Sequence, residues 1–205
     1  MQNNQINWHY HENLARMQGF SRICGIDEAG RGPLAGPVCA AAVVLPNDLI
    51  IPELNDSKKL SEKKRELLFD IIIEQALDYS ISFASAAEID SVNVLQATFL
   101  AMRRAVSGLK TQPDFALVDG NLDPGLALPA QCIVGGDGKS MSIAAASVLA
   151  KVSRDRLMLE LDEQYPGYGL ARHKGYGTKA HYSALGELGL CPEHRRSFLK
   201  KVIGG

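Results

Sequence analysis

The sequence lacks the features that mark several common classes of protein. No stretch comes near the roughly 18 consecutive apolar residues that a membrane-crossing helix needs, and the polar segment from Met1 to Phe20 has no continuous hydrophobic region. The four cysteines show no Cys-x-x-Cys spacing, which disfavours a redox pair or a structural zinc site. No internal repeat or disordered composition is present. We therefore expect a cytoplasmic protein with free thiols and no membrane partner.

The chain also has no large excess of charge of either sign, but its charges are segregated. The formal net charge is −1. From Leu170 onward there are seven Lys or Arg and two acidic residues, whereas the first 169 residues contain 15 basic and 21 acidic ones. A second basic group comprises Lys58, Lys59, Lys63, Lys64 and Arg65. This distribution predicts a basic surface beside an acidic pocket, although either group alone is also typical of solvated lysines.

The sequence does contain enough apolar material for one α/β domain. Hydrophobic residues make up 46% of the 205 residues, which suffices for a sizeable core. Short apolar runs predict strands, and apolar residues at helical spacing predict helices. The predicted strands cover 23–28, 38–45, 79–84, 115–119 and 131–134, and the predicted helices follow Ser61, span 95–107 and 143–165, and include turns near 178–188. We expect a mixed β-sheet flanked by helices, its first two strands antiparallel, with a helical C-terminal part.

Acidic residues follow three of the predicted strands, each time beside glycine. Asp27 and Glu28 precede a Gly-Arg-Gly turn, Asp119 precedes Gly120, and Asp137 lies in a Gly-Gly-Asp-Gly run. Because neighbouring side chains on a strand point to opposite faces, Asp27 and Glu28 reach one site only if the strand ends or bulges there. Clustered carboxylates repel one another and attract a hard divalent cation. A solvated turn explains one such pair, but three acidic turns favour one metal site beyond the strand ends.

Two glycine motifs resemble nucleotide-binding loops but lack essential parts. Gly138-Lys139-Ser140 matches the end of a phosphate-binding loop, yet Ile133 occupies the position of its required first glycine. Gly30 and Gly32 are followed by Pro33 rather than by the helix that would hold a pyrophosphate. The sequence therefore disfavours a nucleotide cofactor.

Three histidines lie in the basic C-terminal segments, at His173, His181 and His194. Their spacing is not that of a metal site. Surface positions, or contacts with phosphate, are favoured over metal ligation.

Five motifs, taken together and in order, resemble bacterial ribonuclease HII, the type 2 ribonuclease H family. The resemblance runs from Arg22 to Phe198. Type 3 relatives carry a sizeable extra N-terminal domain, whereas few residues precede the first motif here, which favours type 2. The motifs are Gly25-Ile26-Asp27-Glu28-Ala29-Gly30-Arg31-Gly32-Pro33, Asp56-Ser57-Lys58-Lys59-Leu60, Leu117-Val118-Asp119-Gly120-Asn121, the segment 142–155 that begins Ser142-Ile143-Ala144-Ala145-Ala146, and His173-Lys174-Gly175-Tyr176.

The resemblance implies a ribonuclease H-like fold, with an N-terminal extension over 1–21 and a catalytic domain over 22–205. It also implies an endonuclease that cuts the RNA strand of RNA–DNA hybrids and cuts 5′ of single ribonucleotides embedded in duplex DNA, leaving 3′-hydroxyl and 5′-phosphate ends. Such an enzyme serves DNA replication and repair, by removing primers and misplaced ribonucleotides.

By position, four carboxylates match the catalytic, metal-binding residues of the family: Asp27, Glu28, Asp119 and Asp137. Two Mg²⁺ or Mn²⁺ ions held there would activate water and neutralise the leaving 3′-oxygen. Gly30, Arg31 and Gly32 match the loop whose backbone approaches the 2′-hydroxyl, and Tyr176 matches a tyrosine that packs on the neighbouring sugar. Phosphate contacts are expected from Lys58, Lys59, Lys139, Lys151 and Arg154, with Asp155 holding Lys151 one helical turn back.

Two further features of the sequence bear on the resemblance: one departure from the family pattern, and the lack of a clamp-binding peptide. Gly135 stands where many relatives have lysine, which removes one expected phosphate contact, and Lys139 is near enough in sequence to replace it. Residues 195–205 contain no paired aromatics of a sliding-clamp peptide, so we expect no clamp partner and a monomer. The competing interpretations are a non-catalytic hybrid-binding protein of the same fold and a nucleotide-binding enzyme that uses Gly138-Lys139-Ser140.

Overall fold

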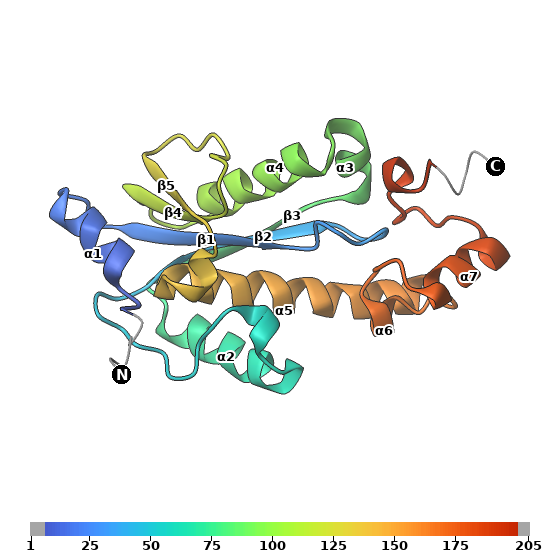
Figure 1. Cartoon of the computed structure of the whole chain (residues 1–205), viewed down its shortest axis with the longest axis horizontal. Coiled ribbons are helices and arrows are strands. Elements are labelled where there is room, and N and C mark those ends of the chain that lie inside the picture. The colour runs from blue at the N-terminus through green and yellow to red at the C-terminus, as the bar shows by residue number, and fades with distance from the viewer. Residues whose placement is uncertain (1–6, 201–205) are drawn as a thin grey trace, which may run out of the picture.

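A five-stranded mixed sheet forms the centre of the protein. The computed structural model describes residues 7–200, and its strands lie in the order β3-β2-β1-β4-β5 (Figure 1). The central strand β1 pairs antiparallel with β2 and parallel with β4, while β3 continues the antiparallel side and β5 the parallel side. The strands are β1 (Ile23–Ala29), β2 (Val38–Val44), β3 (Asp78–Ala84), β4 (Phe115–Asp119) and β5 (Ala130–Ile133). The predicted α/β class and the antiparallel first pair are confirmed.

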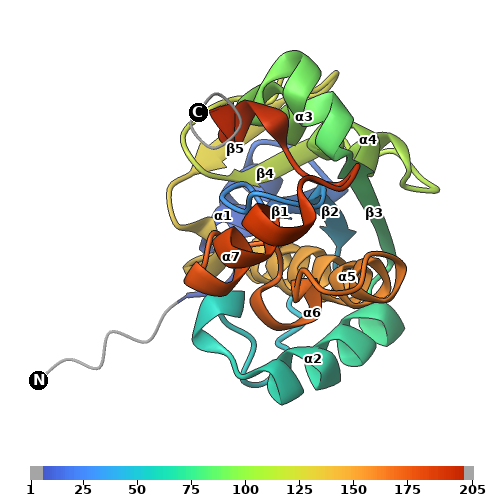
Figure 2. The same cartoon turned by 90° about the vertical axis from the view of Figure 1, so that its right-hand side faces the viewer.

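Helices cover both faces of this sheet. Figures 1 and 2 show α2 and α5 on one face, α3 and α4 on the other, and α6 and α7 at the end of the molecule opposite α1. The helices are α1 (Tyr10–Met17), α2 (Glu62–Gln75), α3 (Ala86–Val92), α4 (Val94–Ser107), α5 (Met141–Gln164), α6 (Leu170–His173) and α7 (Lys179–Leu188), with short 3₁₀ turns η1 (Ser57–Lys59), η2 (Gly136–Gly138) and η3 (Arg196–Phe198). Within residues 7–200, none of the helices combines the length and apolar character required to cross a membrane.

Small side chains let α5 lie very close to the sheet. Strand β2 is buried along its whole length, and its alternate residues pack on α5 on one face and on α4 on the other. The start of α5 contributes Ala144, Ala145 and Ala146, all fully buried. A Cβ atom on Gly25 of β1 would overlap the backbone of Ser142, so only glycine permits this approach. The alanine run in the sequence predicts this close packing, and the structure confirms it.

Several local predictions are confirmed and others need correction. Ser61 caps α2 by accepting a hydrogen bond from the Lys64 amide, and α4 ends at Gly108 as expected. The basic group splits into two parts, because Lys58 and Lys59 lie in η1 whereas Lys63, Lys64 and Arg65 lie in the first turn of α2. Helix α3 was not predicted, although Ser85 forms a capping box with Glu88 that marks its start. Helix α1 lies within the predicted N-terminal extension, and the first six residues of that extension lie outside the described part of the chain.

A buried carboxylate joins α1 to the first turn of α5. One oxygen of Glu12 accepts hydrogen bonds from the Ser140 hydroxyl (2.6 Å), the Ser142 hydroxyl (2.8 Å) and the Ser142 amide (3.2 Å). A negative charge at this position complements the free amides and the dipole of the helix N-terminus. Because η2 ends two residues before Ser140, and the Ser140 amide donates to the Gly136 carbonyl (2.8 Å), the same contacts anchor the turn that carries Asp137.

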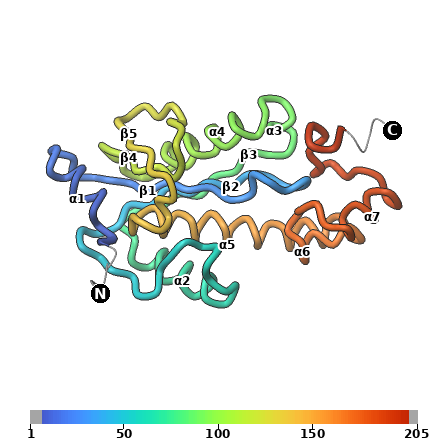
Figure 3. Tube along the Cα trace, viewed as in Figure 1, coloured from blue at the N-terminus to red at the C-terminus, as the bar shows by residue number. Residues whose placement is uncertain are grey.

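The C-terminal segment folds back onto the loop between β1 and β2. The trace in Figure 3 shows this segment and α7 at the far end of α5. The Gly36 amide donates to the Glu193 carbonyl (2.9 Å), and the Arg195 amide donates to the Leu34 carbonyl (2.8 Å). Contrary to the surface positions predicted for them, His181 and His194 are buried here with their Nε2 atoms 3.0 Å apart. Their other ring nitrogens meet backbone groups, which satisfies these polar side chains inside the fold.

Candidate active site

Three of the four predicted carboxylates meet at one end of the sheet. Asp27 on β1, Asp119 at the end of β4 and Asp137 in η2 each place an oxygen within 4.8 Å of the others. The parallel pairing of β1 with β4 brings the first two together. The turn after β5 delivers the third, and it is held in place because the Gly136 amide donates to Asp119 (2.6 Å). Residues distant in sequence thus form one acidic cluster, as predicted.

Glu28 approaches this cluster from the opposite face of β1. The strand stays in regular register through Ala29, which pairs with Cys39, so the predicted strand end or bulge at Asp27 and Glu28 is wrong. Asp27 therefore lies on the face of β1 that packs on α5, near Ser147, and Glu28 lies on the face toward α4. The Glu28 carboxylate accepts a hydrogen bond from Arg31 (3.3 Å) and shares a small pocket with Asp119. Asp27 and Glu28 therefore border the site from opposite faces of β1.

The electrostatics of the cluster favour a bound cation. Burial, followed by the charges of Glu28 and Asp119, raises the pKa of Asp27 well above its usual value. Burial and the charges of Asp119 and Asp56 raise the pKa of Asp137 to about 6. Burial lowers the pKa of the Lys58 ammonium, but the negative charges of the surrounding carboxylates together have the larger effect. The pKa of Lys58 is therefore raised. A donor set made only of carboxylate oxygens fits Mg²⁺ or Mn²⁺.

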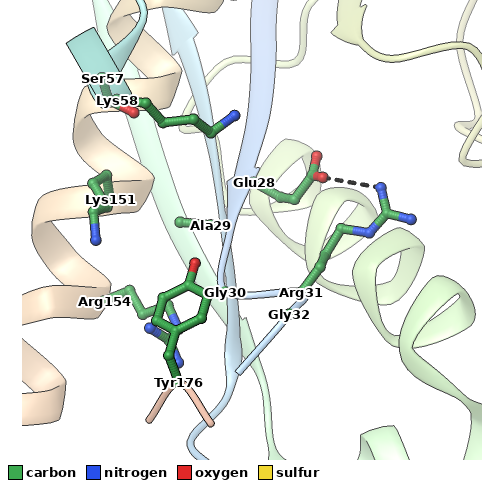
Figure 4. Close-up of a pocket in the computed structure, with 10 residues that line it drawn as sticks. All are labelled: Glu28, Ala29, Gly30, Arg31, Gly32, Ser57, Lys58, Lys151, Arg154 and Tyr176. Carbon is green, nitrogen blue, oxygen red and sulfur yellow. Dashed lines mark hydrogen bonds and ion pairs between the residues drawn. The ribbon is translucent and has the colours of Figure 1, made fainter. Parts of the chain in front are cut away.

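A pocket of about 460 Å³ lies beside the cluster and gathers most of the predicted substrate-binding residues. In Figure 4, Lys58, Lys151 and Arg154 line one side, the pair of Glu28 and Arg31 lies on the other, and Tyr176 stands between them near the glycine loop. Lys151 donates to Asp155 (2.7 Å), as expected. The full lining is Glu28, Ala29, Gly30, Arg31, Gly32, Ser57, Lys58, Lys151, Arg154 and Tyr176.

Three of the residues predicted to bind phosphate have side chains that lie close to other groups of the protein instead. Lys59 is outside this lining, with its ammonium 3.9 Å from Asp56, and Lys139 donates to the Val134 carbonyl (2.6 Å). Arg154 is only 1% exposed and donates to the carbonyls of Pro37 (3.0 Å), Ala35 (3.2 Å) and Lys174 (3.1 Å). Its guanidinium is therefore a buried anchor of the loops around the pocket, and the expected phosphate contact is not supported.

The two glycines of the pocket loop are required for different reasons. Gly30 has φ of +95°, and a Cβ atom there would overlap the Arg154 side chain. A Cβ atom on Gly32 would meet only the Tyr176 ring, at an ordinary 3.6 Å. Packing within the protein therefore explains Gly30 but not Gly32, whose missing side chain leaves room in the pocket itself.

Several residues of the site were not singled out by sequence reasoning. The hydroxyls of Ser57 and Ser147 lie 2.8 Å apart, both buried, and Ser147 also reaches Asp27. Asp56 accepts a hydrogen bond from the Lys58 amide (2.9 Å) and adds its charge next to Asp137. Ser147 directly follows the alanine run of α5, and a lone hydroxyl in a buried apolar segment is a usable signal for such a role.

The comparison with known proteins settles the family. The family described as Ribonuclease HII matches residues 24–201. This chain belongs to the ribonuclease HII family. The ribonuclease HII of Endomicrobium trichonymphae is 62% identical over 182 residues, covering 88% of this chain and 87% of that protein. That of Syntrophotalea carbinolica is 59% identical over 189 residues, covering 92% and 90%. The predicted family and its ribonuclease H activity are confirmed.

Solved structures share the ribonuclease H-like fold. The ribonuclease H2 of Pyrococcus horikoshii matches with a TM-score of 0.73 and 28% identity, over 86% of this chain and 93% of that one. An Archaeoglobus fulgidus ribonuclease HII, solved in complex with PCNA, matches with a TM-score of 0.69 and 26% identity, over 85% and 94%. A ribonuclease HIII solved with Mn²⁺ matches in fold, with a TM-score of 0.66 and 20% identity, over 91% and 69%.

The two pocket glycines can be separated by alanine substitution. Gly30→Ala is expected to lower the free energy of unfolding by more than about 1 kcal/mol, because the alanine would be strained at positive φ and would clash with Arg154. Gly32→Ala is expected to leave the melting temperature nearly unchanged while lowering kcat/KM. Thermal melting and cleavage assays on both variants check this. A destabilised Gly32→Ala protein, or one with full activity, would contradict it.

The acidic cluster should make the metal-free protein less stable as the pH rises. The folded-state pKa of Asp137, about 6, exceeds its ordinary value of 3.8, so the folded protein binds more protons and stability falls between about pH 4 and pH 6. Asp119→Asn should relieve this repulsion and raise the melting temperature at pH 7 by roughly 2–4 °C in EDTA. Melting curves across this pH range test it, with the exposed Asp70→Asn as control. Identical pH profiles for the two variants would contradict the expectation.

Proposed function

We propose that this protein is a metal-dependent endonuclease that hydrolyses the RNA strand of RNA–DNA hybrids and cuts duplex DNA 5′ of an embedded ribonucleotide. The observation that carries the proposal is the closeness of two features, which Glu28 and Lys58 link because both line the pocket and both interact electrostatically with the cluster. One is the buried acidic cluster, and the other is a pocket whose glycine loop and exposed tyrosine leave room for a sugar. Removal of replication primers and of misplaced ribonucleotides would be its cellular role, in the cytoplasm.

The acidic cluster would hold the metal ions, and the pocket would hold the substrate. Asp27, Asp119 and Asp137 would hold divalent ions, with Glu28 joining from the other face of β1. Bound Mg²⁺ or Mn²⁺ would supply the positive charge that an in-line displacement at phosphorus requires. Lys58 and Lys151, on the opposite wall of the pocket, would hold the flanking phosphates without reading sequence. The site needs no nucleophilic side chain, because water is the attacking group.

Sugar recognition would fall to the loop and the tyrosine. The Gly30–Gly32 backbone would approach the 2′-hydroxyl, the group that distinguishes RNA from DNA. Tyr176 is 48% exposed and stands against Gly32, where its ring would pack on the next sugar along the strand. Together these contacts would select a junction between a ribonucleotide and a deoxyribonucleotide. Lys59 and Lys139, which lie outside the pocket lining, would extend the phosphate contacts on a longer duplex.

A non-catalytic hybrid-binding protein is the alternative. A surface that only binds phosphates gains nothing from buried carboxylates whose pKa values are raised, because their charges repel the ligand. We also propose that the protein acts as a monomer without a clamp partner, although part of the segment concerned, residues 201–205, lies outside the described residues. The division at residue 21 and the cytoplasmic location stay predictions.

Removing one carboxylate tests the proposed chemistry. Asp27→Asn should retain affinity for an RNA–DNA hybrid while cutting falls by on the order of 100-fold or more, because the charge that holds the metal is lost. Cleavage of a duplex containing one ribonucleotide is measured in Mg²⁺ and in Mn²⁺, with Asp70→Asn as control. An active Asp27→Asn enzyme in Mg²⁺ would rule out the assignment. A wild-type protein that binds hybrids but cuts them in neither metal would favour the non-catalytic alternative.

Tyr176 provides a test of junction reading. Tyr176→Ala should lose on the order of tenfold in kcat/KM on a single embedded ribonucleotide, because stacking of this kind contributes about 1–3 kcal/mol. Tyr176→Phe should retain most activity, and long hybrids should suffer less because most of their cut sites lack a neighbouring deoxyribose. Tyr10→Ala, at a residue 52% exposed on α1, is the control. Equal losses on both substrates would show that Tyr176 is structural.

A further inference from the structure

Arg195 is the most deeply buried charge that the proposed chemistry does not use. Its side chain is 0% exposed, although the sequence suggests part of a basic surface. Its guanidinium donates to three carbonyls of the loop after β1: Gly30 (2.6 Å), Arg31 (2.9 Å) and Gly36 (2.9 Å). Within residues 7–200, no carboxylate lies within ion-pair distance of it. The backbone of one loop therefore takes the place of a counter-ion.

These bonds determine which way two peptide groups point. In a planar trans peptide, the carbonyl of one residue and the amide of the next point in opposite directions. With the Gly30 and Arg31 carbonyls turned toward Arg195, the Arg31 and Gly32 amides point away from it. Neither amide donates a hydrogen bond to any described residue, and both residues line the pocket. Two successive donors are thus free on the pocket side of the loop.

We propose that Arg195 is a positioning residue that sets ribose selection by orienting these two amides toward the 2′-oxygen of the substrate. This inference rests on the proposed function. A charge-assisted bond to a carbonyl also polarises the peptide and strengthens the amide on its other side as a donor. The three bonds come from three separate nitrogens of one planar group, Nε, Nη1 and Nη2. A guanidinium provides this spacing, whereas the donors of an ammonium all sit on a single nitrogen.

The neighbouring buried arginine has a different task. Arg154 holds the carbonyls of Ala35, Pro37 and Lys174, none of which belongs to the peptides that present the two free amides. Burial and the charge of Arg154 lower the pKa of Arg195 to about 9. Two like charges packed together in the interior destabilise the fold unless each is fully hydrogen-bonded. The three hydrogen bonds from Arg195 to carbonyls can all form only while the loop keeps its present conformation.

The test measures discrimination rather than activity. In the Asp119→Asn background, which leaves the substrate uncut, Kd is measured for a DNA duplex with one ribonucleotide and for the same duplex in all-DNA form. Arg195→Lys should reduce the preference for the ribonucleotide by on the order of tenfold, with affinity for the all-DNA duplex changed by less than about twofold. Arg22→Lys is the matched control, since Arg22 binds the Thr111 carbonyl (3.0 Å) and Asp78 at the opposite end of β1.

A second measurement does not depend on how well Arg195→Lys folds. Amide hydrogen exchange at Arg31 and Gly32, in the Asp119→Asn protein, should slow on binding the ribonucleotide duplex but not the all-DNA duplex. Protection by both duplexes or by neither would overturn the inference. An Arg195→Lys protein that keeps its preference would also overturn it. A wild-type protein that fails to cut at a ribonucleotide would instead refute the proposed function, so the two failures are distinguishable.

Discussion

The approach of α5 to β1 determines where almost every functional group lies. Gly25 has no side chain, and the first turns of α5 carry alanines, so the two elements meet backbone to backbone. From that contact, α5 runs along the sheet and on to the C-terminal helices (Figure 1). Ser147 reaches Asp27, Lys151 reaches the pocket, and Arg154 reaches the loop after β1 from successive turns of this one helix. A wider separation would displace all three at once.

The protein buries a group of negative charges and a pair of positive charges, and stabilises the two in different ways. The acidic cluster has too little positive charge near it, so its pKa values rise and it favours a cation. Among residues 7–200, no carboxylate forms an ion pair with the buried guanidinium of Arg154 or of Arg195, and backbone carbonyls stabilise both instead. Carbonyl oxygens satisfy the donors without neutralising the charge. The loop between the two regions therefore lies in a field directed toward the acids.

Much of the fold could be predicted from the sequence because its signals are local. Strand-like apolar runs, the Ser61 cap and the alanines of α5 depend on neighbouring residues, and the glycine turns after β4 and β5 place Asp119 and Asp137 without any knowledge of packing. The direction of Glu28 could not be predicted, because it depends on how far β1 stays paired with β2. Arg195 and His194 look like surface residues for a related reason. Sequence shows that a side chain is polar, but not that a distant segment supplies carbonyls to satisfy it inside.

The bond between Arg195 and the Gly30 carbonyl joins residues 165 positions apart, which has a consequence for the newly made chain. A ribosome adds Gly30 long before Arg195, so the loop after β1 emerges well ahead of the guanidinium that holds it. The strands and η2, which carry the acidic cluster, and α5, which packs on the sheet, are complete by residue 164. The nascent chain therefore contains every carboxylate of the acidic cluster while the Gly30–Gly32 loop is still free to change shape. During synthesis, the residues of the cluster precede the contact that fixes the final form of this loop.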